Sequence, residues 1–249
     1  MLDIKNLTKT YGDKKAVDSL SLHIAPGEIY GFIGHNGAGK TTTLKSVAGI
    51  LQFDEGEIKI GGVSVKENPL ECKKMLAYIP DNPDIYEFMT GIKYLNFVAD
   101  IFGVGAKERE ERIRKYADLF ELTKDLAEPV SSYSHGMRQK LAVVSAWLHE
   151  PKLILMDEPF GALDAQTRYA MEEEILRIWQ TEKRTIVFVT NNIEEAVTLG
   201  DRIIQFTERP AKVKRVYDLS SLQRPRSHVS EDFMRIRQEI AANEALTLE

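Results

Sequence analysis

Apolar and polar residues alternate along the first part of the chain. The alternating apolar positions are Leu2, Ile4, Val17, Leu20, Leu22 and Ile24. This alternation is typical of antiparallel strands with one solvated face. Residues 56–60, which precede a pair of glycines, predict a further short strand. We therefore expect an antiparallel β subdomain near the N-terminus.

Three short runs are apolar at nearly every position: 28–33 (EIYGFI), 152–156 (KLILM) and 185–189 (TIVFV). Such runs are typical of parallel strands that are buried on both faces. Helical patterns follow at 40–50 and at about 165–181. We expect an α/β fold with a mostly parallel sheet at its core.

Between residues 89 and 148 the apolar positions recur at helical spacing. They are Tyr94, Leu95, Val98, Ile101, Ile113, Tyr116, Ala117, Leu119 and Phe120. The charge run KEREERIRK is typical of a solvated helix face. We predict one domain over 1–249, in which 1–88 and 149–207 form the core with its β subdomain. Residues 89–148 would form an inserted α-helical subdomain.

Residues 208–249 are predicted to form a C-terminal extension. Because the segment contains Pro210 and Pro225, we expect irregular structure up to a terminal helix that Ser230 opens. That helix would carry four apolar side chains on one side, namely Phe233, Met234, Ile236 and Ile240.

Composition narrows the function classes. The 249 residues are 43% hydrophobic and 29% charged, the formal net charge is -5 and no basic run occurs, so we expect no nucleic-acid partner. The single cysteine, Cys72, cannot form an internal disulfide, and the five histidines lack metal-ligand spacing. There is no signal-peptide pattern and no stretch of roughly 18 apolar residues, so we expect a soluble chain.

The first apolar run leads into GHNGAGKT, which fits the P-loop pattern G-x-x-x-x-G-K-[ST]. Glycines let backbone N–H groups approach phosphate oxygens, and the following helix adds the positive end of its dipole. Lys40 would reach the β- and γ-phosphates of ATP, and the Thr41 hydroxyl would coordinate Mg²⁺. The residues assigned to the nucleotide here are Gly34, His35, Asn36, Gly37, Ala38, Gly39, Lys40, Thr41 and Thr42.

A second element is LILMDEP at 153–159, where an apolar strand delivers Asp157 at its carboxyl end. Asp157 would hold Mg²⁺ through water, and Glu158 would polarise the attacking water as a general base.

A third element is SHGMRQK at 134–140, where Ser134 is a good N-cap for a helix through Leu148. A hydroxyl and glycine amides at a helix start form an anion site. Since one chain needs only one γ-phosphate site, we interpret this one as serving the nucleotide of a partner subunit.

The three elements together resemble the ATP-binding subunits of ABC transporters, over nearly all of the chain. Tyr11, in KTYG, matches the aromatic residue that stacks on adenine in that family, and the resemblance adds Val17 as a nucleotide contact. Ser134, Gly136 and Met137 match the signature motif, although the common pattern has Gly and Gln where His135 and Met137 stand. GALD, at 161–164, matches the loop that communicates across the dimer, and assigns Asp164 to the site.

The resemblance implies partners and a location. Two such chains, a homodimer or a pair of related cassettes, would bind two ATP at their shared interface. Closure on ATP and opening after hydrolysis would drive an integral membrane permease. The chain would then be cytoplasmic and peripheral, held on the inner face of the cell membrane by that permease.

Two positions depart from the family pattern. Asp81, in YIPDNP, stands where the family usually has a Gln that senses Mg²⁺ and water near the permease contact. A carboxylate there can approach the metal. Asn191, in VTNN, stands where the family usually has a His that contacts the γ-phosphate. Because Asn donates a hydrogen bond but carries no charge, we predict slower hydrolysis than in a typical member, with Lys40, Glu158 and Asn191 as the catalytic residues.

The two halves of the chain differ in their resemblance. The part up to about residue 158 resembles exporter-type cassettes, as in YGFIGHNGAGKTTTLK, whereas the part after about residue 160 resembles nitrate, sulfonate and taurine importer cassettes. We hypothesise a mosaic, natural or engineered, joined near DEP–LD. Because the two halves would point to different permeases, the sequence does not identify the cargo.

Other functions were weighed against a transporter ATPase. Asn191, Asp81 and the altered signature favour a regulatory module that binds ATP but scarcely hydrolyses it. A non-transport cassette ATPase commonly carries two cassettes in one chain, and this chain has one. A GTPase would show an N-K-x-D motif after the P-loop, and a small-molecule kinase would not explain Ser134 or GALD.

Overall fold

Two β-sheets form the centre of the fold, described for residues 1–161 and 163–245 by a computed structural model. Among these residues a four-stranded antiparallel sheet has the order β2-β1-β4-β5. Its strands are β1 (Leu2–Tyr11), β2 (Lys14–Ile24), β4 (Glu55–Ile60) and β5 (Val63–Ser64). The alternating pattern places apolar side chains of this sheet in a core, as expected.

The second sheet has the order β10-β9-β3-β8-β7-β6. Its strands are β3 (Ile29–Ile33), β6 (Leu76–Ile79), β7 (Leu153–Asp157), β8 (Thr185–Val189), β9 (Arg202–Phe206) and β10 (Val213–Asp218). All neighbours are parallel except β9 and β10. All five residues of β3, of β7 and of β8 are buried. The predicted α/β fold with a mostly parallel sheet is confirmed.

The continuous apolar runs are explained by two cores, one on each face of the parallel sheet. On β3, Tyr30 and Phe32 face the core shared with the antiparallel sheet and α1 (Lys40–Val47). Ile29 and Ile33 face the other core, to which the remaining helices contribute. These helices are α3 (Gly91–Ile101), α4 (Ala106–Leu119), α5 (His135–Trp147), α6 (Ala165–Glu182), α7 (Ile193–Leu199) and α8 (Glu231–Ala245). A strand between two cores has no wet face to alternate with.

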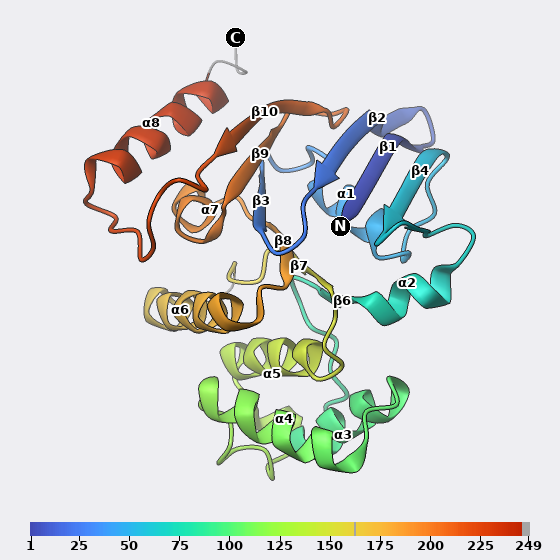
Figure 1. Ribbon diagram of the computed structural model, residues 1–249, viewed down its shortest axis with the longest axis vertical. Coiled ribbons are helices and arrows are strands. Elements are labelled where there is room, and N and C mark those ends of the chain that lie inside the picture. Colours follow the sequence, from blue (N-terminus) through green and yellow to red (C-terminus); the bar gives the residue numbers. More distant parts are fainter. Residues whose placement is uncertain (162, 246–249) are drawn as a thin grey trace.

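Helices α3, α4 and α5 gather at one end of the molecule, away from β1, β2 and β4 (Figure 1). A 3-10 turn, η1 (Val130–Ser132), precedes α5, and α2 (Pro69–Met75) leads into β6. Helix α8 lies toward the opposite end of the molecule from this helical group, beside α7 and β10 (Figure 1). No helix of the described residues is long and apolar enough to cross a membrane.

Three details differ from the sequence prediction. The first helix ends at Val47 rather than 50, because Gly49 turns the chain with φ +66°. The segment after 208, expected to be irregular, contains β10, which pairs with β9 along the sheet edge. On α8, Met234 is 43% exposed, whereas Phe233 is 2% and Ile240 0% exposed. Positions 233, 236 and 240 follow helical spacing, and 234 lies a third of a turn off that face.

Candidate functional site

The P-loop connects β3 to α1 at the carboxyl end of the parallel strands, where α/β proteins form their sites. Gly39 directly precedes α1 with φ +91°. A Cβ atom at Gly39 would lie 2.6 Å from the carbonyl oxygen of Ala16 and 2.8 Å from the Cβ of Ala211. Only glycine fits there, so the loop can pack closely against Ala16 of β2.

Lys40 is 4% exposed and its side chain lies across the loop. Its Nζ donates to the carbonyl oxygens of Gly34 at 2.5 Å and His35 at 3.0 Å, and to Oδ1 of Asn191 at 2.8 Å. The ammonium group is therefore held at the mouth of the loop by groups from the segments that follow β3 and β8. This is the position from which a lysine can contact phosphate oxygens.

Thr41 and Asp157 come together from α1 and β7. Thr41 Oγ1 donates to Asp157 Oδ1 at 2.8 Å, and the hydroxyl of Tyr78 donates to Oδ2 at 3.2 Å. Burial raises the pKa of Asp157, the bonds from Thr41 and Tyr78 oppose this, and the charge of Asp81 adds to it. Asp81 itself is exposed.

Hydroxyl and carboxylate oxygens are the donors that Mg²⁺ prefers, and they fit the ion that the sequence predicts. No group of three or more His, Cys, Asp or Glu side chains that could hold a metal occurs within 1–161 and 163–245. A site with few protein ligands is usual for Mg²⁺, which takes its other ligands from water and substrate phosphates.

Glu158 follows Asp157 directly and turns sharply, with φ +47°. Its backbone N–H donates to the carbonyl oxygen of Val189 at 3.0 Å, which ties it to the adjacent strand β8. Asn191, two residues beyond Val189, donates from Nδ2 to Glu158 Oε1 at 2.8 Å and to Asn36 Oδ1 at 2.9 Å. The amide of Asn191 thus joins the carboxylate, the P-loop and Lys40.

Side chains behind Asn191 hold the loop that carries it. Glu195, on α7, accepts from Thr190 Oγ1 at 2.5 Å and from Asn192 Nδ2 at 3.3 Å. Arg168, on α6, lies 3.4 Å from Glu195 and donates to the carbonyl oxygen of Leu163 at 3.0 Å. The loop at Asn191 is therefore linked to the start of α6, where the GALD segment ends.

A pocket of about 130 Å³ opens over the P-loop. It is lined by Tyr11, Ala16, Asn36, Gly37, Ala38, Gly39, Lys40, Thr41, Thr42, Glu158 and Arg209. Tyr11 is 52% exposed, as suits a ring that stacks on a base. Val17 is fully buried and bridges to Ala211, so its neighbour Ala16 lines the pocket instead. The sequence analysis did not assign Ala16, Arg209 or Tyr78 to the site. Arg209 and Tyr78 reach it only through long-range packing.

The signature residues lie outside this pocket. Ser134 caps α5, because its Oγ accepts from the N–H of Met137 at 3.2 Å. A Cβ atom on Gly136 would lie 3.5 Å from side-chain atoms of Leu163 and Thr167, so the start of α5 lies against the start of α6. Asp164 caps α6 through the N–H of Thr167 at 3.0 Å. Ala162 of GALD lies outside the described residues, as do 246–249. It stays a prediction that these signature residues bind the nucleotide held by a second copy of the chain.

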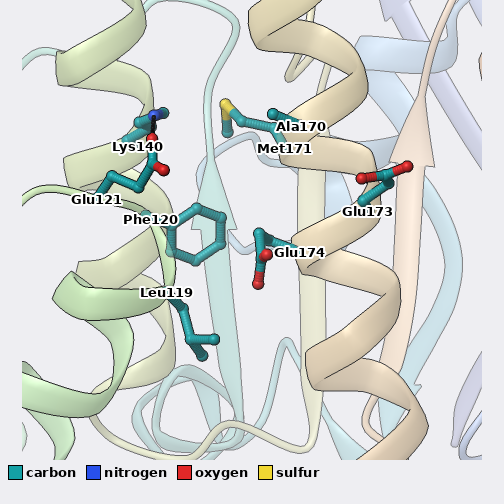
Figure 2. A pocket seen from close by; sticks show the side chains of 8 residues that line it. All are labelled: Leu119, Phe120, Glu121, Lys140, Ala170, Met171, Glu173 and Glu174. Atoms are coloured by element: carbon teal, nitrogen blue, oxygen red, sulfur yellow. Dashed lines mark ion pairs between the residues drawn. The ribbon is translucent and has the colours of Figure 1, made fainter.

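A separate small cavity, of about 100 Å³, lies between α6, the end of α4 and the middle of α5 (Figure 2). Figure 2 shows Phe120 and Met171 along its walls, with Glu121 and Lys140 paired at 3.9 Å on one side. None of the predicted site residues lines it. The chemistry therefore belongs to the P-loop pocket.

Comparison with known proteins decides which family this site represents. The ABC transporter family matches residues 17–161, from β2 past Glu158. The chain belongs to the ABC transporter family. It is 34% identical over 243 residues to an uncharacterized ABC transporter ATP-binding protein of Methanocaldococcus jannaschii, covering 96% of this chain and 89% of that protein. The cassette is thus an ATP-binding subunit of the ABC type, and an ATPase.

Two relatives carry named transport roles. The choline transport ATP-binding protein OpuBA of Bacillus subtilis is 38% identical over 210 residues, which cover 82% of this cassette. The chain spans 54% of the length of that protein. The aliphatic sulfonates import ATP-binding protein SsuB of Bacillus cereus is 32% identical over 236 residues, covering 95% of this cassette and 91% of SsuB.

A solved structure shares the fold. It is the dimeric structure of an ATP-binding cassette in a post-hydrolysis state, bound to ADP and phosphate. It has a TM-score of 0.79 and 25% identity, and covers 88% of this chain and 99% of its own. The alignments with the archaeal protein and SsuB run across the junction near DEP–LD. A single family therefore suffices to account for both halves, and the mosaic stays a hypothesis.

Proposed function

We propose that this cassette binds ATP with Mg²⁺, pairs with a second cassette to hydrolyse it slowly, and thereby energises a separate membrane permease. The observation that carries the proposal is the bonding of Asn191 to Lys40, Glu158 and Asn36 at the mouth of the P-loop. These groups come from three segments, namely the P-loop and the chain just after β7 and after β8. Their convergence fits an ATPase site rather than a passive turn.

Each residue has a role in this proposal. Lys40 neutralises charge on the β- and γ-phosphates, and Glu158 orients and polarises the attacking water. Thr41, Asp157 and Asp81 would hold Mg²⁺, whose charge would further stabilise the phosphate oxygens. Asn191 would exchange its bond to Asn36 Oδ1 for one to the transferred phosphoryl group, since its amide has only two N–H donors and both are engaged. Its neutral amide would stabilise developing negative charge less than a charged donor would.

The slow rate follows from the chemistry of Asn191. Its amide is already well placed, because both its donor and its acceptor atoms are engaged by site residues. What it lacks is charge, and a hydrogen bond from a neutral donor is roughly half as strong as a charge-assisted one. We therefore assign the cassette to the slow end of its family rather than to a non-hydrolysing module.

The partner cassette would complete each site. Ser134, Gly136 and Met137 form a capped helix start that lies outside the P-loop pocket of their own chain. A helix start with free amides suits a phosphate group, and a two-fold dimer would bring it to the nucleotide of the other copy. The dimeric state of the related post-hydrolysis cassette supports this arrangement.

Dimerisation gives the sharpest test of this part. In the Glu158→Gln variant, ATP with Mg²⁺ should shift the chain from monomer to dimer in size-exclusion chromatography, and ADP should not. Adding Ser134→Arg should abolish the shift while leaving ATP binding intact, and Ser131→Arg, on the nearby exposed turn, should leave the shift unchanged. A dimer that forms regardless of Ser134 would contradict the shared site.

An exposed aromatic patch supports a permease contact. Tyr86, Phe88 and Phe97 are 47%, 81% and 37% exposed, and the ring of Tyr86 lies 5.7 and 5.6 Å from the other two. Contiguous exposed apolar groups of this kind mark interaction surfaces. Glu87 pairs with Arg138 on α5 at 2.8 Å, so the patch is attached to the helix that Ser134 begins. We propose that the permease binds here and holds the cassette at the cytoplasmic membrane face.

The cargo would be chosen by the permease. OpuBA is named for choline, a cation, and SsuB for sulfonates, which are anions. Both resemble this cassette, so the cassette provides energy in either case, and selection of the cargo lies outside it.

A further inference from the structure

Arg209 lies at the P-loop pocket although it is distant in sequence. It is an exposed residue in the loop between β9 and β10. Its Nε donates to the carbonyl oxygen of Gly37 at 3.2 Å, and its Nη2 lies 3.4 Å from where a Cβ atom on Gly37 would stand. The guanidinium group therefore rests on the P-loop backbone and forms part of the pocket lining.

The loop that carries Arg209 is held in place at both ends. Thr207 Oγ1 donates to the carbonyl oxygen of Pro210 at 2.9 Å and accepts from the N–H of Lys212 at 3.0 Å. The N–H of Ala211 donates to the carbonyl oxygen of Ala16 at 2.9 Å, which joins the loop to β2. Arg209 thus extends from a backbone that is fixed against the same strand that supports Gly39.

The charge of Arg209 lacks a carboxylate partner in the part of the chain that the structure describes. Within 1–161 and 163–245 no Asp or Glu oxygen lies within 4.0 Å of its guanidinium nitrogens, and its side chain makes one hydrogen bond, from Nε. Guanidinium has five N–H donors in a planar fork that suits phosphate oxygens. A cation with unused donors, set beside a loop whose amides and lysine bind phosphate, fits an anionic ligand in that pocket.

We propose that Arg209 is a further nucleotide-binding residue, whose guanidinium contacts a phosphate oxygen of bound ATP from the Gly37 side of the P-loop. This inference rests on the proposed function, since it concerns the same ATP. The segment after β9 would then contact the nucleotide, in addition to the P-loop and the residues at the carboxyl ends of β7 and β8.

The test is displacement of a fluorescent nucleotide from the full chain by ATP, inorganic triphosphate or adenosine. Arg209→Ala and Arg209→Gln should each weaken ATP and triphosphate about tenfold, the scale of one charge-assisted hydrogen bond at a partly exposed site. Adenosine should bind all variants equally. Arg209→Lys should recover part of the loss. Lys212→Gln, which removes a cation from the same loop, should bind like the wild type.

Two outcomes would overturn the proposal. Gln can still donate to the Gly37 oxygen, so wild-type affinity in Arg209→Gln would reduce Arg209 to a support for the loop. Equal losses for adenosine and ATP would place the contact on the base. Melting temperatures without nucleotide, expected within about 2 °C of the wild type for an exposed substitution, show that the variants fold. Failure of the proposed function is distinct, since the wild type itself would then not bind ATP.

Discussion

The Nδ2 atom of Asn191 lies 2.8 Å from Oε1 of Glu158, while Oδ1 of the same amide accepts from Lys40 at 2.8 Å. One neutral side chain therefore connects the proposed general base, Glu158, to the lysine that we propose binds phosphate. The amide fixes the position of the carboxylate without adding charge. Asn191 can therefore position the carboxylate but does not supply charge to the phosphoryl group, whereas a histidine could do both.

Asn191→His should therefore raise turnover, because the imidazole can carry a proton and stabilise the transferred phosphoryl group. We expect about a tenfold increase in phosphate release at saturating ATP, a modest part of the 10²–10³ that one transition-state donor supplies. Asn191→Gln, which keeps a neutral amide at the same position, serves as the control and should give no increase. Unchanged turnover in Asn191→His would show that charge at this position does not limit the rate.

Stability should depend on pH through Glu172, which is 3% exposed on α6. Burial and the charge of Glu195 raise its pKa from 4.5 to about 8, with Glu173 and Glu194 adding to this and Arg168 opposing it. The folded state therefore keeps a proton that the unfolded chain releases between about pH 4.5 and 8. Stability should fall as pH rises through that window and stay low above it.

Glu172→Gln removes this proton linkage and should be tested by thermal melting at two pH values. At pH 5 the wild-type carboxyl is protonated, so the variant should melt close to the wild type. At pH 8.5 the variant should melt several degrees higher, since it avoids a buried charge. Glu111→Gln, which replaces an exposed glutamate on α4, is the matched control. An equal difference at both pH values would refute the linkage.

The aromatic patch leads to a prediction about membrane attachment. Phe88→Asp places a charge on the most exposed ring of the patch and should remove the cassette from host membranes in fractionation. Its ATP affinity as a purified chain should match the wild type, because the patch lies outside the nucleotide pocket. Leu70→Asp changes another exposed apolar residue, 75% exposed on α2, and should stay with the membrane. If both variants were lost from the membrane fraction, the effect would not be specific to the patch.

The sequence predicts most of the catalytic segments because their signals are local. The P-loop and Glu158 directly follow an apolar strand, and Asp157 is the last residue of one. Parallel strands bring their carboxyl ends to one edge. Even Asn191 could be placed, since the run TIVFV ends just before it. The positions of such residues in the fold depend more on which strand precedes them than on how side chains pack.

Other features depend on long-range packing, and the sequence left them out. Arg209 meets Gly37 across 172 positions of the chain, and nothing in its neighbourhood of Glu and Pro indicates a phosphate site. Strand β10 lies at the sheet edge with mostly exposed side chains, so its pattern lacks the apolar run that identifies β7 and β8. Val17 and Ala16 differ only in which way β2 points them, and one step along a strand reverses that direction.

Steady-state phosphate release by the purified cassette tests the central claim most directly. The account predicts release that requires Mg²⁺ and ATP in the wild type. It predicts a loss of at least about 100-fold in Glu158→Gln, the scale expected when a general base is removed. ATP affinity should persist in that variant. Equal release by Glu158→Gln and the wild type, at equal ATP affinity, would contradict the assignment of this site as the place where ATP is hydrolysed.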